Sequence, residues 1–402
     1  MEIHLFWALS AAGWLGAVIS ARVRRGRLYA TFAGILVGIH SLIACTLAPH
    51  VAAISPYLLP VYGLFHALVY VHYIALAKPR MRPLAYRVLV SLPASFFAAS
   101  TLLAMPWAIV GALTTPRALF VPYALGLLGL IEGLTTKREE VDLVIDRLPV
   151  EGLRRHPKDR APEGARRPLR LVQITDPHLG PFMSVARLAE ICARAVKLDP
   201  DLVLLTGDFL TMESQDSPEH LARALAPLAA LPGKVFSCNG NHDHESPAFV
   251  AEALRRNGVR HLVDESTVVE TPAGPVQIVG LDFHFKERAT RIARAIAENP
   301  RVEGALRLVM LHNPGAIRDL PEGEGDLVLS GHTHGGQLGL VRLGLPYTIM
   351  RLFVDMPDHG LWARGRDRLY VHRGTCHYGF PVRLGVPAEE SLLRVHLPAR
   401  ET

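Results

Sequence analysis

The first third of this 402-residue chain has little charge. Residues 28–77 contain no Asp, Glu, Lys or Arg, which a water-soluble domain of that length would hardly tolerate and a lipid-embedded region requires. Cysteine is also scarce, and the four residues are far apart, with no C-x-x-C pair: Cys45, Cys192, Cys238 and Cys376. This usage indicates neither a disulfide framework nor a structural zinc site, and it fits a reducing compartment.

Apolar runs of membrane-spanning length make up the region 1–136, which is predicted to be an all-α transmembrane bundle. Five spans are predicted, at 3–20, 28–47, 57–77, 88–113 and 118–134. The last is marginal in length and carries Glu132. Prolines within and between these runs blur the boundaries, so counts of four or six spans stay open.

The distribution of cations predicts the orientation of the bundle. The segments 21–27 and 78–87 are short and basic, whereas 48–56 has no charge, so the positive-inside rule places the basic loops in the cytoplasm. Five spans then place the rest of the chain on the cytoplasmic side of the inner membrane. A cleaved signal peptide over 1–20 is not indicated, because its basic residues would precede the apolar run and here they follow it.

A basic linker is predicted over 137–168, after the membrane region. The basic stretch 154–170, which begins in this linker and reaches the start of the next domain, is rich in Arg, Pro and Gly, and its cations either hold that domain near anionic lipid or are simply solvated. These residues explain part of the net charge of +6. Nucleic-acid binding would need basic residues interleaved with aromatics or a known module, and neither is present in the sequence. No obligate protein partner is inferred.

From residue 169 to about 400, short β-type apolar runs alternate with amphipathic stretches, which predicts an α/β layered domain. Strands are predicted at 169–175 and 201–208, and helices at 185–196 and 247–257. The second helix is marked by Ser246 as its N-cap and by Gly258 as its terminator.

Polar side chains follow five predicted strands at the point where each strand ends. They are Asp176 and His178; Asp208; Asn241, His242 and Asp243; His312; and His332 and His334. Ligands bind at the carboxyl ends of strands in α/β sheets, so these groups are expected to converge on one point. Carboxylates, imidazoles and an amide oxygen are ligands for Zn, Mn or Fe, and this set is too large for one ion. Two ions about 3.5–4 Å apart, bridged by one carboxylate, would use all of them and would clamp a phosphoryl displacement.

The series "DPH", "GD", "GNHD", "H" and "GHTH" resembles the calcineurin-like metallophosphoesterase superfamily. The stretches "GHTHGGQ" and "HRGTCHYGFPVRLGVPAE" resemble its membrane-anchored bacterial branch, which is similar to the UDP-2,3-diacylglucosamine pyrophosphatases. Each motif alone is short enough to arise by chance, but all five in order, each behind a strand, are specific. The resemblance covers about 169–398 and implies a β-sandwich flanked by helices.

The resemblance also implies two divalent metal ions (Mn, Zn or Fe) and a role for each motif residue. The first ion would be bound by Asp176, His178 and His334, the second by Asn241, His312 and His332, and Asp208 would bridge them. His242 is implied to act on the substrate, as general acid or by stabilising charge on the phosphoryl oxygens. Gly240 is expected to allow a tight backbone turn beside these residues.

The residues around these motifs leave several alternatives. Asp243 either orients His242 or satisfies backbone donors, and His244 and Glu245 are expected to be loop residues. Two departures from the family pattern, Pro177 and Asn239, remove no ligand. Arg373 and Arg383 are candidates for binding phosphate, and His372 and His377 for lining the pocket, although each equally fits a structural role. The histidines in predicted spans are either functional or hydrogen-bonded between helices: His40, His66 and His72.

The segment 338–357 is apolar, and it either docks on the bilayer and receives acyl chains or packs as a buried loop. With the membrane anchor, it favours a lipid-linked phosphodiester or pyrophosphate substrate, such as UDP-2,3-diacylglucosamine in lipid A biosynthesis. A soluble cyclic nucleotide or a phosphoprotein is the alternative substrate. A non-catalytic membrane sensor is a third hypothesis, but it predicts the loss of a metal ligand, and none is missing from the motifs.

Overall fold

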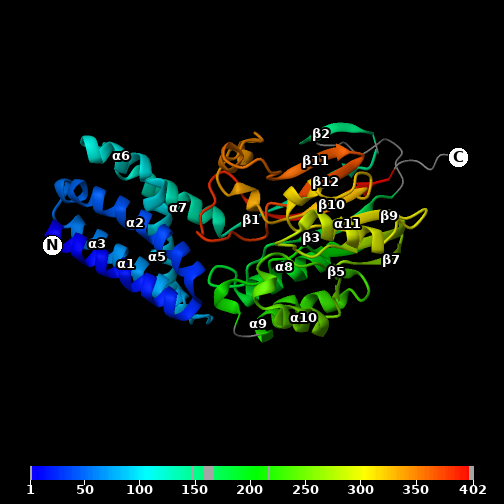
Figure 1. Cartoon of the computed structure of the whole chain (residues 1–402), viewed down its shortest axis with the longest axis horizontal. Helices are drawn as coiled ribbons and strands as arrows, with labels where there is room; N and C mark the ends of the chain where they lie inside the picture. The colour runs from blue at the N-terminus through cyan, green and yellow to red at the C-terminus, as the bar shows by residue number, and fades with distance from the viewer. Residues whose placement is uncertain (1, 147, 158–166, 216–217, 398–402) are drawn as a thin grey trace. The chain divides into compact units, whose positions relative to one another are not determined.

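The computed structural model describes residues 2–146, 148–157, 167–215 and 218–397 and divides the chain into two compact units (Figure 1). The first unit is Met1–Leu134 with Met212–Asp216 and Gly379–Leu384. The second unit is Thr135–Thr211, Ser217–Tyr378 and Gly385–Thr402. Each unit has its own hydrophobic core.

The first unit is helical, as the sequence predicts. Its long helices are α1 (Ile3–Arg25), α2 (Arg27–Ile54) and α3 (Leu58–Leu76). They are followed by α4 (Leu84–Tyr86), a π-helical turn (Arg87–Ser91), α5 (Leu92–Leu103), α6 (Met105–Leu113) and α7 (Val121–Gly133). Within the described part of the chain, four segments are long and apolar enough to cross a membrane: Ile3–Arg25, Arg27–Ile54, Leu58–Leu76 and Leu84–Leu103.

The two last predicted spans differ from the helices of the structure. The span predicted at 88–113 starts earlier, at Leu84, and is divided at Ala104, where α5 gives way to α6 with Pro106 in its first turn. The span predicted at 118–134 corresponds to α7, which has 13 residues. At 1.5 Å per residue this helix is about 20 Å long, shorter than the roughly 30 Å apolar core of a bilayer.

The second unit contains two β-sheets. One has the strand order β1-β13-β3-β4-β5-β6 and the other β2-β11-β12-β10-β9-β8-β7. The first sheet contains β1 (Thr136–Val144), β3 (Leu169–Ile174), β4 (Leu202–Leu205), β5 (Val235–Ser237), β6 (Arg260–His261) and β13 (Ala388–His396). The second contains β2 (Val150–Arg155), β7 (Glu265–Thr271), β8 (Gly274–Gly280), β9 (Leu306–Met310), β10 (Leu327–Ser330), β11 (Gly360–Gly365) and β12 (Asp367–Val371).

Alternating side chains build three apolar layers around these sheets. Leu171 and Leu204 point into the core between the two sheets, whereas Val172 and Leu205 belong to the core on the outer face of the first sheet. That outer core is covered by α8 (Val185–Lys197), α9 (Pro218–Leu225) and α10 (Pro247–Arg256), while α11 (Arg288–Glu298) covers the second sheet (Figure 1). The β-sandwich flanked by helices is therefore confirmed. Burial of each such leucine contributes about 1.5–3 kcal/mol.

The segment predicted as a basic linker, 137–168, differs from the structure in its first part. It contains most of β1 and all of β2, and β1 pairs with β13 in parallel from Thr136 opposite Ala388 to Val144 opposite His396. Charged residues precede and separate the inward-facing Val141 and Leu143, so this strand lacks the apolar run by which the other strands are predicted. Residues 158–166 of the predicted linker lie outside the described residues.

Candidate metal centre

The polar groups predicted at strand ends lie in loops that follow the carboxyl ends of strands from both sheets. Asp176 follows β3 and Asp208 follows β4 in the first sheet, whereas His312 follows β9 and His332 follows β10 in the second. Within each sheet these two strands are parallel neighbours, so their ends meet at the same edge. The groups predicted to converge on one point therefore come from the strand ends of two packed sheets.

Six of the seven predicted metal ligands form two adjacent clusters. They are Asp176 with His178 and His334, and Asp208 with His312 and His332, and within each cluster the ligand-type atoms all lie within 4.8 Å of one another. His334 Nε2 is 3.4 Å from Asp176 Oδ1, and His312 Nε2 is 3.2 Å from Asp208 Oδ2. The clusters are also close to each other, since His178 Nε2 lies 3.7 Å from Asp208 Oδ2.

The seventh predicted ligand, Asn241, sits beside the second cluster. The next residue, His242, donates its backbone N–H to Asp208 Oδ1 over 2.8 Å. The side-chain oxygen of Asn241 is buried and has no hydrogen-bond partner among the described residues. An unsatisfied buried acceptor costs about 1–3 kcal/mol, a cost that a bound cation removes. Together with the imidazole and carboxylate donors, this orphaned oxygen fits a site for divalent metal ions.

The backbone of the predicted ligands is strained. The left-handed region, which non-glycine residues rarely adopt, is occupied by five of them: Asp176, His178, Asp208, His332 and His334, with φ of 52°, 43°, 57°, 69° and 51°. Such conformations cost of order 1–3 kcal/mol each and are concentrated at functional sites. The fold retains them because the loops aim all five side chains at one point.

Gly240 is required for a reason other than the predicted tight turn. Gly240 is absent from the positive-φ residues, so its backbone does not need glycine for conformational freedom. A Cβ at this position would collide with the carboxylate of Asp208 and would crowd the Asp208 backbone nitrogen. Glycine therefore allows the loop after β5 to approach the Asp208 loop closely.

Hydrogen bonds outside the clusters orient the ligands. The Nδ1 atoms of His312 and His334 lie 2.7 Å from the Thr206 carbonyl oxygen and 2.9 Å from the Cys376 carbonyl oxygen. A carbonyl only accepts, so each Nδ1 carries the proton and Nε2 is left to face the clusters. On the opposite side, Asp176 accepts hydrogen bonds from the Thr175 hydroxyl and from the His332 backbone.

The site balances buried negative and positive groups. Burial raises the pKa of Asp176 to about 6, although the adjacent His312 favours the carboxylate. Burial opposes ionisation of Asp208 too, but His312 outweighs it and lowers the pKa of Asp208. Burial also lowers the pKa of His178 to about 3, so this imidazole is neutral and able to bind a metal.

The two alternatives for Asp243 are decided by its contacts. Its carboxylate accepts backbone hydrogen bonds from Asp208 (2.7 Å), Phe209 (2.9 Å) and Gly240 (2.7 Å). Asp243 therefore satisfies backbone donors and joins the loop after β4 to the loop after β5. Burial raises the pKa of this carboxyl to about 7.

Glu245 was predicted to be a loop residue without a specific role, but its side chain contacts His242. His242 Nδ1 lies 2.7 Å from Glu245 Oε1. Burial disfavours the imidazolium, but the hydrogen bond to Glu245 outweighs it and raises the pKa of His242. The signal that could have found Glu245 is its i+3 spacing from His242 on a short helical turn, Asp243–Glu245.

Aromatic rings flank the clusters, and no spacing in the sequence indicates them. The ring centroid of Tyr378 is 4.6 Å from that of His242 and 4.7 Å from that of His178, and 43% of Tyr378 is exposed. Phe283 lies on the side of the other cluster, 5.9 Å from the His332 ring. Next to it, Asp282 accepts a hydrogen bond from Asn239, one of the two departures from the family pattern, and lies 2.9 Å from His244 Nε2.

The predicted phosphate-binding and pocket-lining residues have structural partners. Arg373 is buried, donates from Nε to Glu389 (3.0 Å) and pairs with Glu139 (3.0 Å). Arg383 is buried in the first unit and donates its backbone N–H to Gly129. The buried His377 packs against Phe182, and His372 Nδ1 accepts a hydrogen bond from the Gly374 backbone.

The histidines of the predicted spans are buried within the first unit. His40 Nε2 is 3.1 Å from His66 Nδ1, and His66 Nε2 is 2.8 Å from the Tyr70 hydroxyl. His72 is also buried and lies beside Tyr73. The contacts of His40 and His66 favour hydrogen bonding between helices over a separate site.

Comparison with known proteins agrees with this geometry. The family model of the calcineurin-like phosphoesterases matches residues 169–336. Phosphodiesterase YaeI of Escherichia coli is 29% identical over 57% of this chain and 82% of its own length. Metallophosphoesterase YkoQ of Bacillus subtilis is 30% identical over 57% and 83%. UDP-2,3-diacylglucosamine pyrophosphatase LpxG of Chlamydia trachomatis is 28% identical over 56% and 83%. The chain therefore belongs to the calcineurin-like metallophosphoesterases, a family of hydrolases that use divalent metal ions.

Proposed function

We propose that this chain is a membrane-anchored phosphoesterase that uses two divalent ions to hydrolyse a phosphodiester or pyrophosphate bond of a lipid-linked substrate such as UDP-2,3-diacylglucosamine. The observation that carries the proposal is the pair of adjacent clusters centred on Asp176 and Asp208. The four candidate membrane spans and the similarity to LpxG support a substrate that resides in the bilayer.

The ligands divide between two ions in this proposal. Asp176, His178 and His334 would hold the first, Asn241, His312 and His332 would hold the second, and Asp208 would be shared by both. When bound, the ions would neutralise charge on the phosphate and increase the acidity of a water molecule. Identification of each ion as Mn, Zn or Fe requires measurement, since all three accept this mixed nitrogen and oxygen donor set.

His242 acts on the leaving group in this proposal. Its Nδ1 is engaged by Glu245, which leaves Nε2 as the nitrogen available to substrate. Water attacks phosphorus in line and loses one proton to solvent, the bond from phosphorus to the leaving oxygen breaks, and the imidazolium donates its Nε2 proton to that oxygen. Glu245 fixes the ring orientation and stabilises the positive charge of the imidazolium before the transfer.

A turnover panel on the detergent-purified full chain tests the substrate class. We expect hydrolysis of a UDP-linked diacyl sugar and of a generic aryl phosphodiester in the presence of Mn, Zn or Fe. Activity on a phosphomonoester alone would overturn the proposed substrate class. No turnover of any substrate with any metal would favour the non-catalytic sensor, even though every motif ligand is present.

A further inference from the structure

A long apolar segment, 338–357, lies on the surface of the second unit. Its exposed large side chains are Leu340, Leu343, Leu345, Tyr347, Ile349, Leu352, Phe353 and Val354. Exposure reaches 73% at Leu343, 76% at Leu352 and 82% at Phe353. The alternative that this segment is a loop buried against the domain core is therefore wrong. Monomeric soluble proteins rarely expose so many large apolar side chains together, and such patches mark interaction sites.

The segment has a defined conformation. Its first part is a hairpin, in which Leu340 donates its backbone N–H to Tyr347 over 2.8 Å and Ile349 donates to Leu338 over 2.9 Å. A short helical turn, Ile349–Leu352, follows, and its last residue, Leu352, and the next residue, Phe353, are the most exposed apolar groups of the segment. The apolar side chains are thus presented on a structured element.

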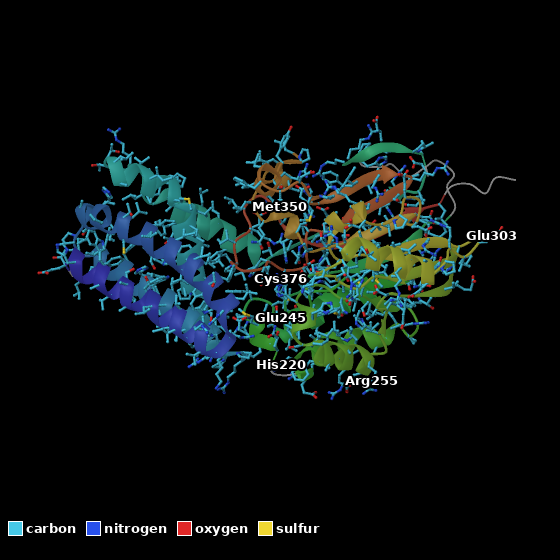
Figure 2. All side chains as sticks on the ribbon, viewed as in Figure 1. His220, Glu245, Arg255, Glu303, Met350 and Cys376 are labelled. Carbon is cyan, nitrogen blue, oxygen red and sulfur yellow. The ribbon has the colours of Figure 1, made fainter. Side chains whose placement is uncertain are left out.

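The segment is fastened to the loop that carries two metal-ligand histidines. Thr348 donates its hydroxyl to the Asp358 carboxylate (2.7 Å), and Thr333, between His332 and His334, donates to the Asp358 carbonyl (2.6 Å). A Cβ at Gly336 would lie 2.8 Å from Met350 Cβ, so the two loops are in close contact. Figure 2 shows Met350 on the same side of the second unit as Cys376 and Glu245, away from Glu303.

We propose that 338–357 inserts into the interfacial layer of the bilayer and delivers a lipid-linked substrate to the metal centre, an inference that rests on the proposed function. The four candidate spans would anchor the chain in a bilayer. Only two residues separate the end of α7 at Gly133 from the start of β1 at Thr136, so the second unit follows the helices directly along the chain. Two arginines, Arg342 and Arg351, against one aspartate, Asp355, make the segment cationic, which suits anionic headgroups.

Insertion is tested by a fluorescent label on the full chain in vesicles of phosphatidylethanolamine and phosphatidylglycerol. The variant Phe353→Cys is labelled with an environment-sensitive dye in a Cys45→Ala background, since the other three native cysteines are buried. Val302→Cys, 40% exposed and outside the segment, is the matched control. We expect lipids carrying a quencher on their acyl chains to quench the dye at 353 and not at 302. Equal quenching at both positions, none at 353, or protection at 353 by a second copy of the chain would overturn the proposal.

A second measurement separates delivery of substrate from chemistry. In the same vesicles, the double variant Leu352→Ser, Phe353→Ser is expected to hydrolyse a UDP-linked diacyl sugar about tenfold more slowly and a soluble aryl phosphodiester at the unchanged rate. If the double variant and the native chain hydrolyse the lipid-linked substrate at equal rates, or if the variant loses activity equally on both substrates, delivery by this segment would be contradicted. If the native chain fails on every phosphoester, the proposed function fails, while the quenching measurement still decides whether the segment inserts.

Discussion

At the residue scale, the loop after β5 divides its tasks among four neighbouring polar side chains. Asn241 presents an unpartnered buried oxygen, Asp243 accepts three backbone hydrogen bonds, and Glu245 holds His242. The motif identified the candidate ligand and the candidate acid, because both are family signatures. It could not separate the two roles considered for Asp243 or find Glu245, since both depend on which atoms meet once the loop is folded.

Asn241→Ala tests the ligand assignment. Removal of the amide oxygen would take away one donor to the proposed second ion, so we expect turnover to be abolished while the fold is retained. Asn239→Ala is the control, because this amide in the same loop donates to Asp282 and is not among the proposed ligands. Circular dichroism and turnover of the aryl phosphodiester check both variants. Unchanged activity of Asn241→Ala would contradict the assignment.

Glu245→Gln tests how His242 is held. Loss of the carboxylate removes the charge that orients the imidazolium, so we expect kcat to fall about tenfold for phosphodiesters with a poor leaving group. The effect should shrink for a nitrophenolate leaving group, which needs little protonation. Glu252→Gln on α10, which breaks an exposed pair with Arg255, is the control. An equal loss for both leaving groups would argue against a role through the acid.

At the element scale, the sequence predicted the elements with a simple apolar pattern and missed those whose pattern is interrupted. The strands around 169–175 and 201–208 and the helix at 247–257 appear as β3, β4 and α10. Ser246 stands at the N-cap of α10, as predicted, but its side chain makes no capping hydrogen bond. The sequence did not predict β1, because five of its nine residues are charged. Its inward-facing residues can be recognised as part of a strand only once β1 is paired with β13.

The role of Arg373 likewise depends on contacts that the sequence does not reveal. A variant of Arg373 distinguishes a structural role from a role in substrate binding. Burial opposes ionisation of Glu389, but His372 and Arg373 outweigh it and lower the pKa of Glu389 to about 2, so this carboxylate is charged at neutral pH. Arg373→Met removes the guanidinium that pairs with the buried Glu389 and with Glu139, and we expect a loss of about 3–5 kcal/mol of stability.

Thermal unfolding of the full chain measures this loss, with Arg256→Met as the control, because Arg256 forms only exposed ion pairs, which contribute little to stability. The KM of the folded fraction for a soluble diester should be unchanged. A raised KM with an unchanged melting temperature would instead support the predicted role of Arg373 in binding phosphate.

At the scale of the whole molecule, a phosphoesterase domain follows directly after apolar helices in the chain. The proposed cytoplasmic location of this domain depends on whether one of these helices, α7, crosses the membrane. Four candidate spans alone would return the chain to the side on which it began, so the location predicted from the basic loops requires α7 to act as the fifth crossing. With only 13 residues, α7 needs a thinned bilayer or flanking residues to complete it.

A reporter fused to the carboxyl end of the chain tests this topology. We expect a green fluorescent protein fusion to fluoresce and an alkaline phosphatase fusion to be inactive in cells, because both results mark the cytoplasmic side. The opposite pair of results would place the domain outside. A UDP-sugar would then be unavailable to it, and another lipid-linked phosphoester would have to be the substrate.

The central claim is that the clusters around Asp176 and Asp208 hold two metal ions that are both required for hydrolysis. Its most direct test is titration of the metal-depleted full chain with Mn while turnover of an aryl phosphodiester is recorded against bound metal. We predict no turnover without metal and saturation at two ions per chain. Saturation at one ion, or full turnover of the metal-free chain, would contradict the claim.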